Sequence, residues 1–238
     1  MPAVRAVTDT LQGSPSPTPA DARPHEGTLP PVLRGWLHLV CFVASVPAGI
    51  VVVASASTSR GRLAAVVYAF GMTAMFGVSA AYHRRRWSPA ARQRMRRTDH
   101  GTIFLMIAGS YTPLCLLALR GTTGTAILTA VWTGAAFGFF LALTGFAEKA
   151  VLGLICYIAL GWVMVLALPE LSHHLSGGQI ALLLAGGVVY TIGGVVLGTR
   201  WPNPSPRWFG YHEVWHTMVV AACVCHYLTI LSVVRSFG

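Results

Sequence analysis

Residues 212–234 read HEVWHTMVVAACVCHYLTILSVV, and the last 18 of them, 217–234, contain no Asp, Glu, Lys or Arg. A run of about 20 mainly apolar residues is long enough to cross the hydrocarbon core of a bilayer as one α-helix. We therefore predict a membrane-spanning helix whose polar first turn, with His212 and His216, lies at the membrane edge.

The rest of the chain repeats this pattern. Apolar residues make up 54% of the 238 residues, charged residues only 10%, and the mean hydropathy is +0.62, whereas about a quarter of a soluble domain is charged. Segments of spanning length lie near 33–54, 63–83, 101–119, 125–147, 150–168, 179–199 and 212–234. The sequence thus predicts an all-α, polytopic membrane protein, a bundle of seven transmembrane helices within residues 31–238.

The first 30 residues have a different composition. They are rich in Pro, Ser and Thr and lack the apolar core of a signal peptide. Segments with so few large apolar residues do not bury enough surface to fold. We expect residues 1–30 to form a disordered cytoplasmic tail, and the first span to act as its own insertion signal.

The basic residues give the orientation of the bundle. If the N-terminus is cytoplasmic, 13 of the 17 Lys and Arg fall on inside segments, seven of them in RRRWSPAARQRMRR, residues 84–97. Cytoplasmic loops of membrane proteins carry such an excess. We therefore predict a multi-pass plasma-membrane protein with a cytoplasmic N-terminus, and we attribute the net charge of +10 to topology and not to nucleic-acid binding.

Polar side chains gather at one end of the predicted bundle. His83 ends the second span, Asp99 begins the third, and His212 and His216 begin the seventh, all on the cytoplasmic side. Ionisable groups at membrane depth are costly and mark candidate functional sites. Three imidazoles with an open fourth position form a typical catalytic zinc site, so we predict Zn²⁺ bound by His83, His212 and His216.

Two further residues belong to the predicted site. Ser79 precedes His83 by four residues, so it shares the same helix face about one turn deeper. Its hydroxyl is placed to orient a bound water or to stabilise an oxyanion, and Asp99 is placed to accept a proton. Simpler interpretations are that Asp99 caps the third helix and that Ser79 bonds within the helix bundle.

The letters HEVWH also match the H-E-x-x-H signature of zinc proteases, in which the Glu is the general base. Those enzymes take their third ligand downstream, but no Asp or Glu follows Glu213. The third ligand therefore has to come from upstream, where His83 is best placed. Because Glu213 projects about 100° away from His212, we expect it to support a ligand or to pair with an Arg.

Three blocks, SAAYHRRRW (79–87), RTDHGTIFLMIAGSYTP (97–113) and GYHEVWHTMVVAACVCHY (210–227), resemble the hemolysin III family, the bacterial branch of the progestin and adipoQ receptor superfamily. The resemblance covers residues 31–238. It implies a seven-helix fold with a cytoplasmic N-terminus and zinc held near the inner leaflet by His83, His212 and His216. It also implies that Asp99 and Ser79 hold the zinc water.

Other histidines fit this pattern less well. Relatives usually carry an acidic residue and an Asn before the His of the first span, and PVLRGWLH, residues 31–38, has neither, which leaves any role of His38 open. His226 lies ten residues after His216, about 15 Å deeper and off the ligand face, so we expect a helix-packing histidine. His173 and His174 are expected in an outer loop.

These observations favour a zinc-dependent hydrolase of an amide- or ester-linked membrane lipid. The motif layout is similar to that of alkaline ceramidases, which makes an amide the better substrate. The alternatives are a cytolytic protein or a ligand-sensing receptor with a structural metal, and iron is an alternative to zinc. A pore is expected to show a polar stripe through several spans, whereas the polar groups here gather at one end.

Overall fold

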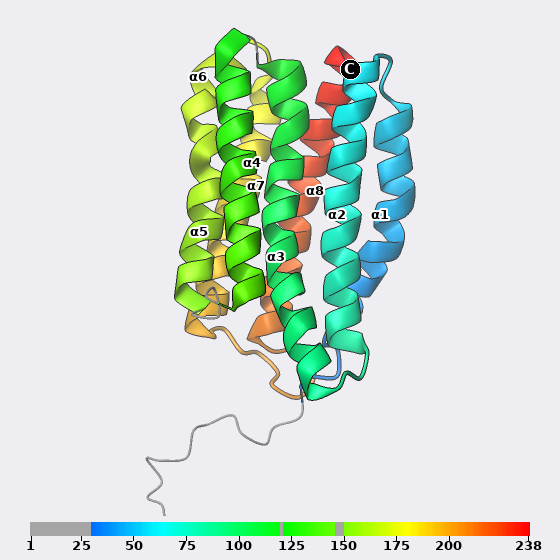
Figure 1. Cartoon of the computed structure of the whole chain (residues 1–238), viewed down its shortest axis with the longest axis vertical. Helices are drawn as coiled ribbons and strands as arrows, with labels where there is room; N and C mark the ends of the chain where they lie inside the picture. The colour runs from blue at the N-terminus through cyan, green and yellow to red at the C-terminus, as the bar shows by residue number, and fades with distance from the viewer. Residues whose placement is uncertain (1–29, 120, 146–149) are drawn as a thin grey trace, which may run out of the picture. The chain divides into compact units, whose positions relative to one another are not determined.

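The computed structural model describes residues 30–119, 121–145 and 150–238 as a bundle of α-helices (Figure 1). Within these residues no β-strand occurs, and one isolated bridge pairs Ser205 with Phe209. The expected tail, residues 1–30, lies outside the described part of the chain except for Pro30. Its disorder therefore stays a prediction.

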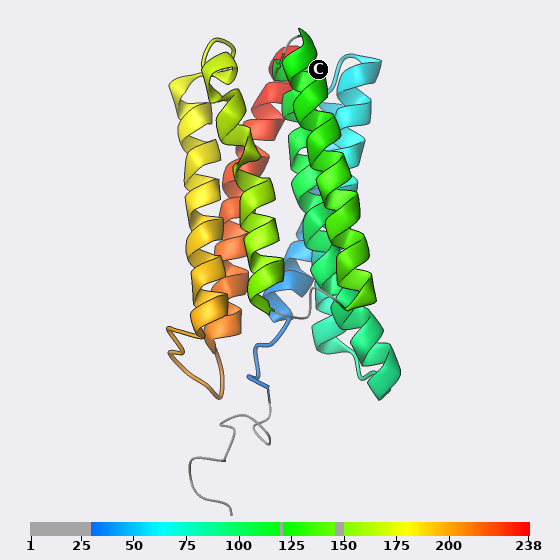
Figure 2. The same cartoon turned by 60° about the vertical axis from the view of Figure 1, so that its left-hand side comes forward.

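Seven helices of the described residues are long and apolar enough to cross a membrane, which confirms the predicted seven-helix, all-α fold. Consecutive spans alternate in direction (Figures 1 and 2). The helices are α1 (Trp36–Ala54), α2 (Ser59–Arg84), α3 (Pro89–Pro113), α4 (Gly121–Thr144), α5 (Ala150–Trp162), α6 (Leu168–Leu171), α7 (Gly177–Thr199) and α8 (Tyr211–Phe237). A π-helical turn, Leu114–Ala118, extends α3, and a 3₁₀ segment, Val163–Ala167, joins α5 to α6 within the fifth span.

Helix α3 begins three turns earlier than the apolar run indicates. Ser88 is its N-cap and accepts a hydrogen bond from the Ala91 amide (3.4 Å), and Pro89 occupies the first turn, where its missing N–H costs nothing. The arginine-rich segment after Ser88 is therefore helical. The prediction that Asp99 begins this helix is wrong, and so is its interpretation as a cap, because Asp99 lies in the helix interior.

Helix α8 lies inside the bundle and contacts α1, α2, α3 and α7. Its apolar face, with Trp215 and Val219, packs in one buried cluster with Tyr68, Met72 and Phe76 of α2. In a membrane, such van der Waals packing is a main source of helix association. The packing brings the first turn of α8 beside the last turn of α2.

The segment before α1 is tied to the loop before α8. The amide of Val32 donates to the Arg207 carbonyl (3.0 Å), and the amide of Leu33 donates to the Trp208 carbonyl (3.2 Å). The beginning of the first span and the beginning of the last span therefore lie together at one end of the bundle, where α2 also ends (Figure 2).

Tyr111 of α3 joins the broken fifth span to the bundle. Its hydroxyl donates to the Gly161 carbonyl (2.6 Å) and accepts from the Met164 amide (2.7 Å). Backbone groups freed by a helix break need such partners because lipid offers none. Tyr111 thereby holds the wall that α5 contributes to the interior cavities.

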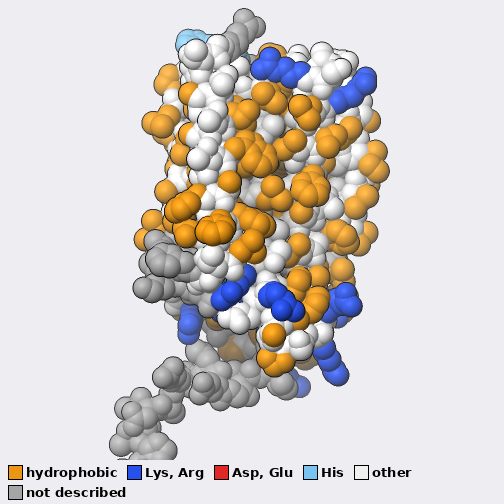
Figure 3. Space-filling model, in the orientation of Figure 1, with side chains coloured by type: hydrophobic (Ala, Val, Ile, Leu, Met, Phe, Trp, Pro, Cys, Tyr) orange, Lys and Arg blue, Asp and Glu red, His pale blue; other side chains and the backbone are white. Residues whose placement is uncertain are grey.

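Apolar side chains cover the middle of the visible face, and the Arg side chains lie toward its two ends (Figure 3). Three described arginines, Arg60, Arg62 and Arg235, belong to the end opposite the start of α1. The other ten described arginines belong to the end that holds the start of α1: Arg34, Arg84, Arg85, Arg86, Arg92, Arg94, Arg96, Arg97, Arg200 and Arg207. This asymmetry supports the predicted cytoplasmic N-terminus.

Candidate metal centre

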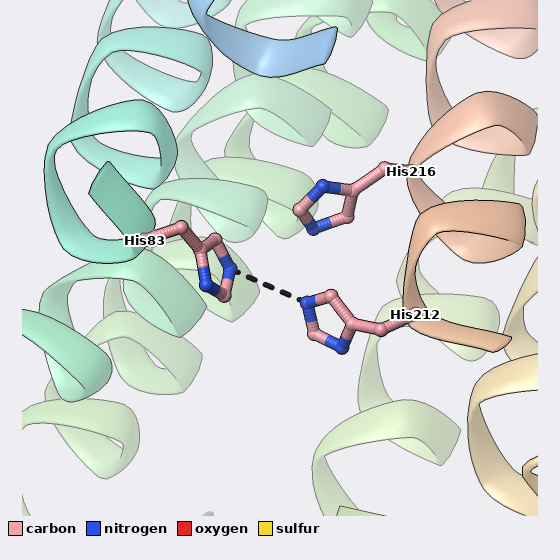
Figure 4. A group of neighbouring side chains, drawn as sticks. All are labelled: His83, His212 and His216. Carbon is pink, nitrogen blue, oxygen red and sulfur yellow. Dashed lines mark hydrogen bonds between the residues drawn. The ribbon is translucent and has the colours of Figure 1, made fainter. Parts of the chain in front are cut away.

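Three histidines from two helices meet at the arginine-rich end of the bundle (Figure 4). His212 and His216 lie one turn apart on α8, and His83 lies in the last turn of α2. One ring nitrogen from each residue lies within 4.8 Å of the other two. The Nε2 atoms of His83 and His212 are 3.3 Å apart, so these two rings point at the same space.

The three rings fit a metal ion. Ligand nitrogens that lie 2.0–2.1 Å from zinc at a tetrahedral angle are about 3.4 Å from each other, close to the 3.3 Å between His83 and His212. The donors are imidazoles alone, a set that suits zinc and also iron, copper or nickel. His83, His212 and His216 thus form a group that can hold a divalent metal ion.

Asp99 of α3 and Ser79 of α2 lie beside the three rings. The Asp99 Oδ2 atom is 3.9 Å from the His83 Nε2 atom, too far for a hydrogen bond. Ser79 is buried, with 3% of its surface exposed, and it lines the same cavity as Asp99. The carboxylate therefore lies next to the imidazole group, with the Ser79 hydroxyl on the same cavity.

Except for His83, these side chains line one cavity of about 100 Å³. Its polar wall consists of His38, Ser79, Asp99, His100, His212 and His216. The facing wall is mainly apolar and includes Met75, Ile103, Leu154, Tyr157, Tyr190, Leu197, Trp215 and Val219. The cavity can therefore receive a molecule that has both a polar group and an apolar chain.

Glu213 does not line this cavity. One of its carboxylate oxygens pairs with the Arg34 guanidinium, and the other accepts a hydrogen bond from the Gly210 amide at 2.9 Å. The prediction that Glu213 pairs with an Arg is confirmed. An acidic side chain also stabilises the positive end of a helix, so Glu213 fixes the first turn of α8, which carries His212.

His38 of α1 is the residue of this region that sequence reasoning missed. Its ring stacks on His216, with centroids 3.8 Å apart and planes 7° from parallel. It is buried, and neither ring nitrogen has a hydrogen-bond partner among the described residues. The signal that could have found it is a histidine at membrane depth.

The remaining histidines of interest lie elsewhere. The His226 Nε2 atom is 3.3 Å from the Leu183 carbonyl oxygen, as expected for a helix-packing histidine, and the residue also lines two cavities in the bundle. His173 and His174 lie in the turn between α6 and α7, as expected for an outer loop. None of these three lies in the imidazole group.

Comparisons with known proteins agree with the fold and with the sequence blocks. The family model described as haemolysin-III related matches residues 28–227. Hemolysin-3 of Bacillus cereus is 30% identical over 197 residues, which are 82% of this chain and 87% of that protein. The hemolysin-3 homolog of Bacillus subtilis (strain 168) is 31% identical over 134 residues, 56% of this chain and 60% of the relative.

An animal protein is also similar. The monocyte to macrophage differentiation factor of Homo sapiens is 24% identical over 173 residues, 71% of this chain and 69% of its own. The expected resemblance is thereby confirmed in both its bacterial and its animal branch. With its seven apolar helices, this chain is a multi-pass plasma-membrane protein that belongs to the haemolysin-III-related family.

Proposed function

We propose that this protein is a zinc-dependent hydrolase of an amide- or ester-linked membrane lipid. The observation that carries the proposal is the juxtaposition of three imidazoles with Ser79 and Asp99, beside a cavity that His212, His216, Ser79 and Asp99 line. A metal group, an acid and a buried hydroxyl on one wall are the parts that a hydrolytic site needs.

His83, His212 and His216 would hold the zinc ion, which would act as a Lewis acid and would lower the pKa of water at the site from 15.7 toward about 7. Asp99 accepts a proton from the attacking water, because its carboxylate lies next to His83 and faces the cavity. Ser79 lines the same cavity and offers its hydroxyl to the developing oxyanion. The surrounding apolar wall limits the access of bulk water to the acid.

The substrate is an amphiphile that presents its polar group to the site. Beyond the cavity at the imidazole group lies a second cavity of about 90 Å³ with a mainly apolar lining. The two cavities share six lining residues, namely Met75, Ile103, Leu154, Tyr157, Tyr190 and Trp215. An acyl chain can extend from the polar group along this lining toward the middle of the bundle.

The site faces the cytoplasmic leaflet in this proposal. His83, His212 and His216 lie at the end of the bundle that carries ten of the described arginines. That end is cytoplasmic if the excess of basic residues follows the usual rule for membrane proteins.

Metal analysis combined with lipid mass spectrometry tests the proposal. We expect about one zinc ion per purified chain, loss of that zinc in His216→Ala, and release of free fatty acid from membrane lipids by the wild type but not by His216→Ala. His173→Ala is the matched control because this histidine lies in the turn after α6. Purified protein that takes up no stoichiometric metal contradicts the proposal.

A cytolytic activity is the second candidate, because two similar proteins carry the name hemolysin-3 or its homolog. In that case dye leakage from liposomes should proceed unchanged in Asp99→Asn, which keeps the three imidazoles. The second cavity, beyond the imidazole group, has a mainly apolar lining, whereas a conducting pore needs a polar path. The hydrolase proposal therefore accounts better for the described residues.

A further inference from the structure

His38 lies between two aromatic neighbours next to the imidazole group. On one side it stacks on His216 at 3.8 Å, and on the other it meets the edge of Phe76, with ring centroids 5.2 Å apart. Only 4% of its surface is exposed. The position and plane of the His38 ring are therefore fixed by packing, and the ring in turn covers one face of His216.

The two ring nitrogens distinguish His38 from a packing residue. A neutral imidazole carries one N–H donor and one acceptor, and here both atoms are buried without a hydrogen-bond partner among the described residues. Burying unpaired polar atoms destabilises a fold, and such atoms in a native structure call for an explanation. Phe or Leu would fill this position at a lower cost in stability.

The geometry of the stack excludes one explanation of the unpaired nitrogens, namely that His38 and His216 bind the same ion. The lone pair of a ring nitrogen lies in the plane of its ring, and the planes of His38 and His216 are 7° from parallel. An ion in the plane of His216 therefore lies outside the plane of His38. The two residues do not bind the same ion in this arrangement, and the fourth position of the metal is left for other ligands.

His38 also lines the cavity that contains Ser79, Asp99 and His212. We propose that His38 is a positioning residue of the metal centre, which fixes the ring of His216 by stacking and hydrogen-bonds the uncharged polar group of the bound amphiphile. This inference rests on the proposed function, because it takes the substrate to be a neutral amide or ester. It does not require that turnover be observed.

Two variants separate the stack from the hydrogen bond. His38→Ala removes both, and His38→Phe keeps an aromatic ring and removes the nitrogens. Zinc affinity is measured by competition with a chromogenic chelator. We expect His38→Ala to bind Zn²⁺ at least about 10-fold more weakly than wild type, which is the scale for groups that orient a metal ligand. We expect His38→Phe to stay within about 3-fold of wild type, because the stack on His216 is kept.

The hydrogen bond is tested on cobalt-substituted protein, whose visible spectrum reports a ligand at the metal. N-methyloctanamide is the probe, and its dissociation constant is measured by titration. We expect His38→Phe to bind this amide about 10-fold more weakly than wild type, the scale of one hydrogen bond of about 1.4 kcal/mol. Equal affinity in the two proteins overturns the substrate contact.

Stability of the chelator-treated protein gives a second readout. Because His38→Phe removes two unpaired buried nitrogens, we expect it to unfold at or above the wild-type temperature without metal. Ser45→Ala is the control on the same helix, since Ser45 is buried and bonds Phe42 and Thr73 away from the site. It should leave the affinities for zinc and for the amide unchanged.

The outcomes distinguish this inference from the proposed function. If the wild type binds neither zinc nor the amide, the proposed function fails. If the wild type binds both and the two His38 variants match it, only the inference about His38 fails. A His38→Phe protein that is less stable than wild type and unchanged in amide affinity identifies His38 as a packing residue.

Discussion

Glu213 joins Arg34, which lies 179 positions earlier in the chain, to the first turn of the last helix. The carboxylate is buried and the guanidinium is partly exposed. Because the same carboxylate also accepts the Gly210 amide, one side chain connects the segment before α1 with the start of α8. Neither residue lines the cavity beside the three histidines.

This connection predicts coupled effects on stability. Glu213→Gln and Arg34→Gln should each lower the free energy of unfolding by about 1–3 kcal/mol, because each leaves the other residue of the pair without its opposite charge. The double variant should cost little more than either single change. Thermal unfolding in detergent measures this cycle, and additive losses would show that the two residues act independently. Zinc content should stay near one per chain in all three.

Metal binding should stabilise the bundle, because the three imidazoles come from α2 and α8 and the ion joins both helices. A ligand at 100 times its dissociation constant contributes about 2.7 kcal/mol, which raises the unfolding temperature of a chain of this size by about 5–10 °C. Differential scanning fluorimetry with added zinc measures the shift. His83→Ala should abolish it, and His173→Ala should retain it.

Asp99→Asn separates metal binding from chemistry. The amide keeps the shape of the carboxylate and the neighbouring Ser79 hydroxyl, so zinc content should stay near that of wild type. Removal of a proton acceptor should lower the rate of lipid hydrolysis by about 10²- to 10⁴-fold, measured as fatty acid release. Glu213→Gln is the control and should keep activity within about 10-fold, since Glu213 does not line the cavity. Full activity of Asp99→Asn would remove Asp99 from the mechanism.

Tyr111→Phe tests the bridge across the fifth span. The change leaves the Met164 amide and the Gly161 carbonyl without the Tyr111 hydroxyl, so we expect a loss of about 1–3 kcal/mol in stability. Tyr227→Phe is the comparison, because its hydroxyl donates a single bond to the Ala48 carbonyl (3.1 Å). Equal losses in the two variants would mean that the helix break needs no special support.

The sequence predicts the seven spans well because each is a long apolar run, and length and hydropathy alone define such runs. It predicts the start of α3 poorly, since the apolar run begins near Asp99 whereas the helix begins at the Ser88 and Pro89 cap. An arginine-rich helical turn has no hydropathy signal. Only local capping chemistry marks it.

The sequence likewise predicts one part of the candidate site and not the other. The spacing of His212 and His216 places both on one helix face from the sequence alone, and the count of spans places His83 at the same end. The stack of His38 on His216 depends on how α1 packs beside α8. Contact between two distant spans leaves no local pattern, so no spacing in the sequence reports it.

The pairing of the first and last spans has a consequence for biosynthesis. His83, Asp99 and Ser79 enter the membrane early, while His212, His216 and Glu213 arrive only with the final helix. Until then the early polar groups and Arg34 have no partners from α8. The imidazole group is therefore complete only at the last step of insertion. A ribosome that stops before residue 211 leaves a six-span chain that lacks two of the three imidazoles.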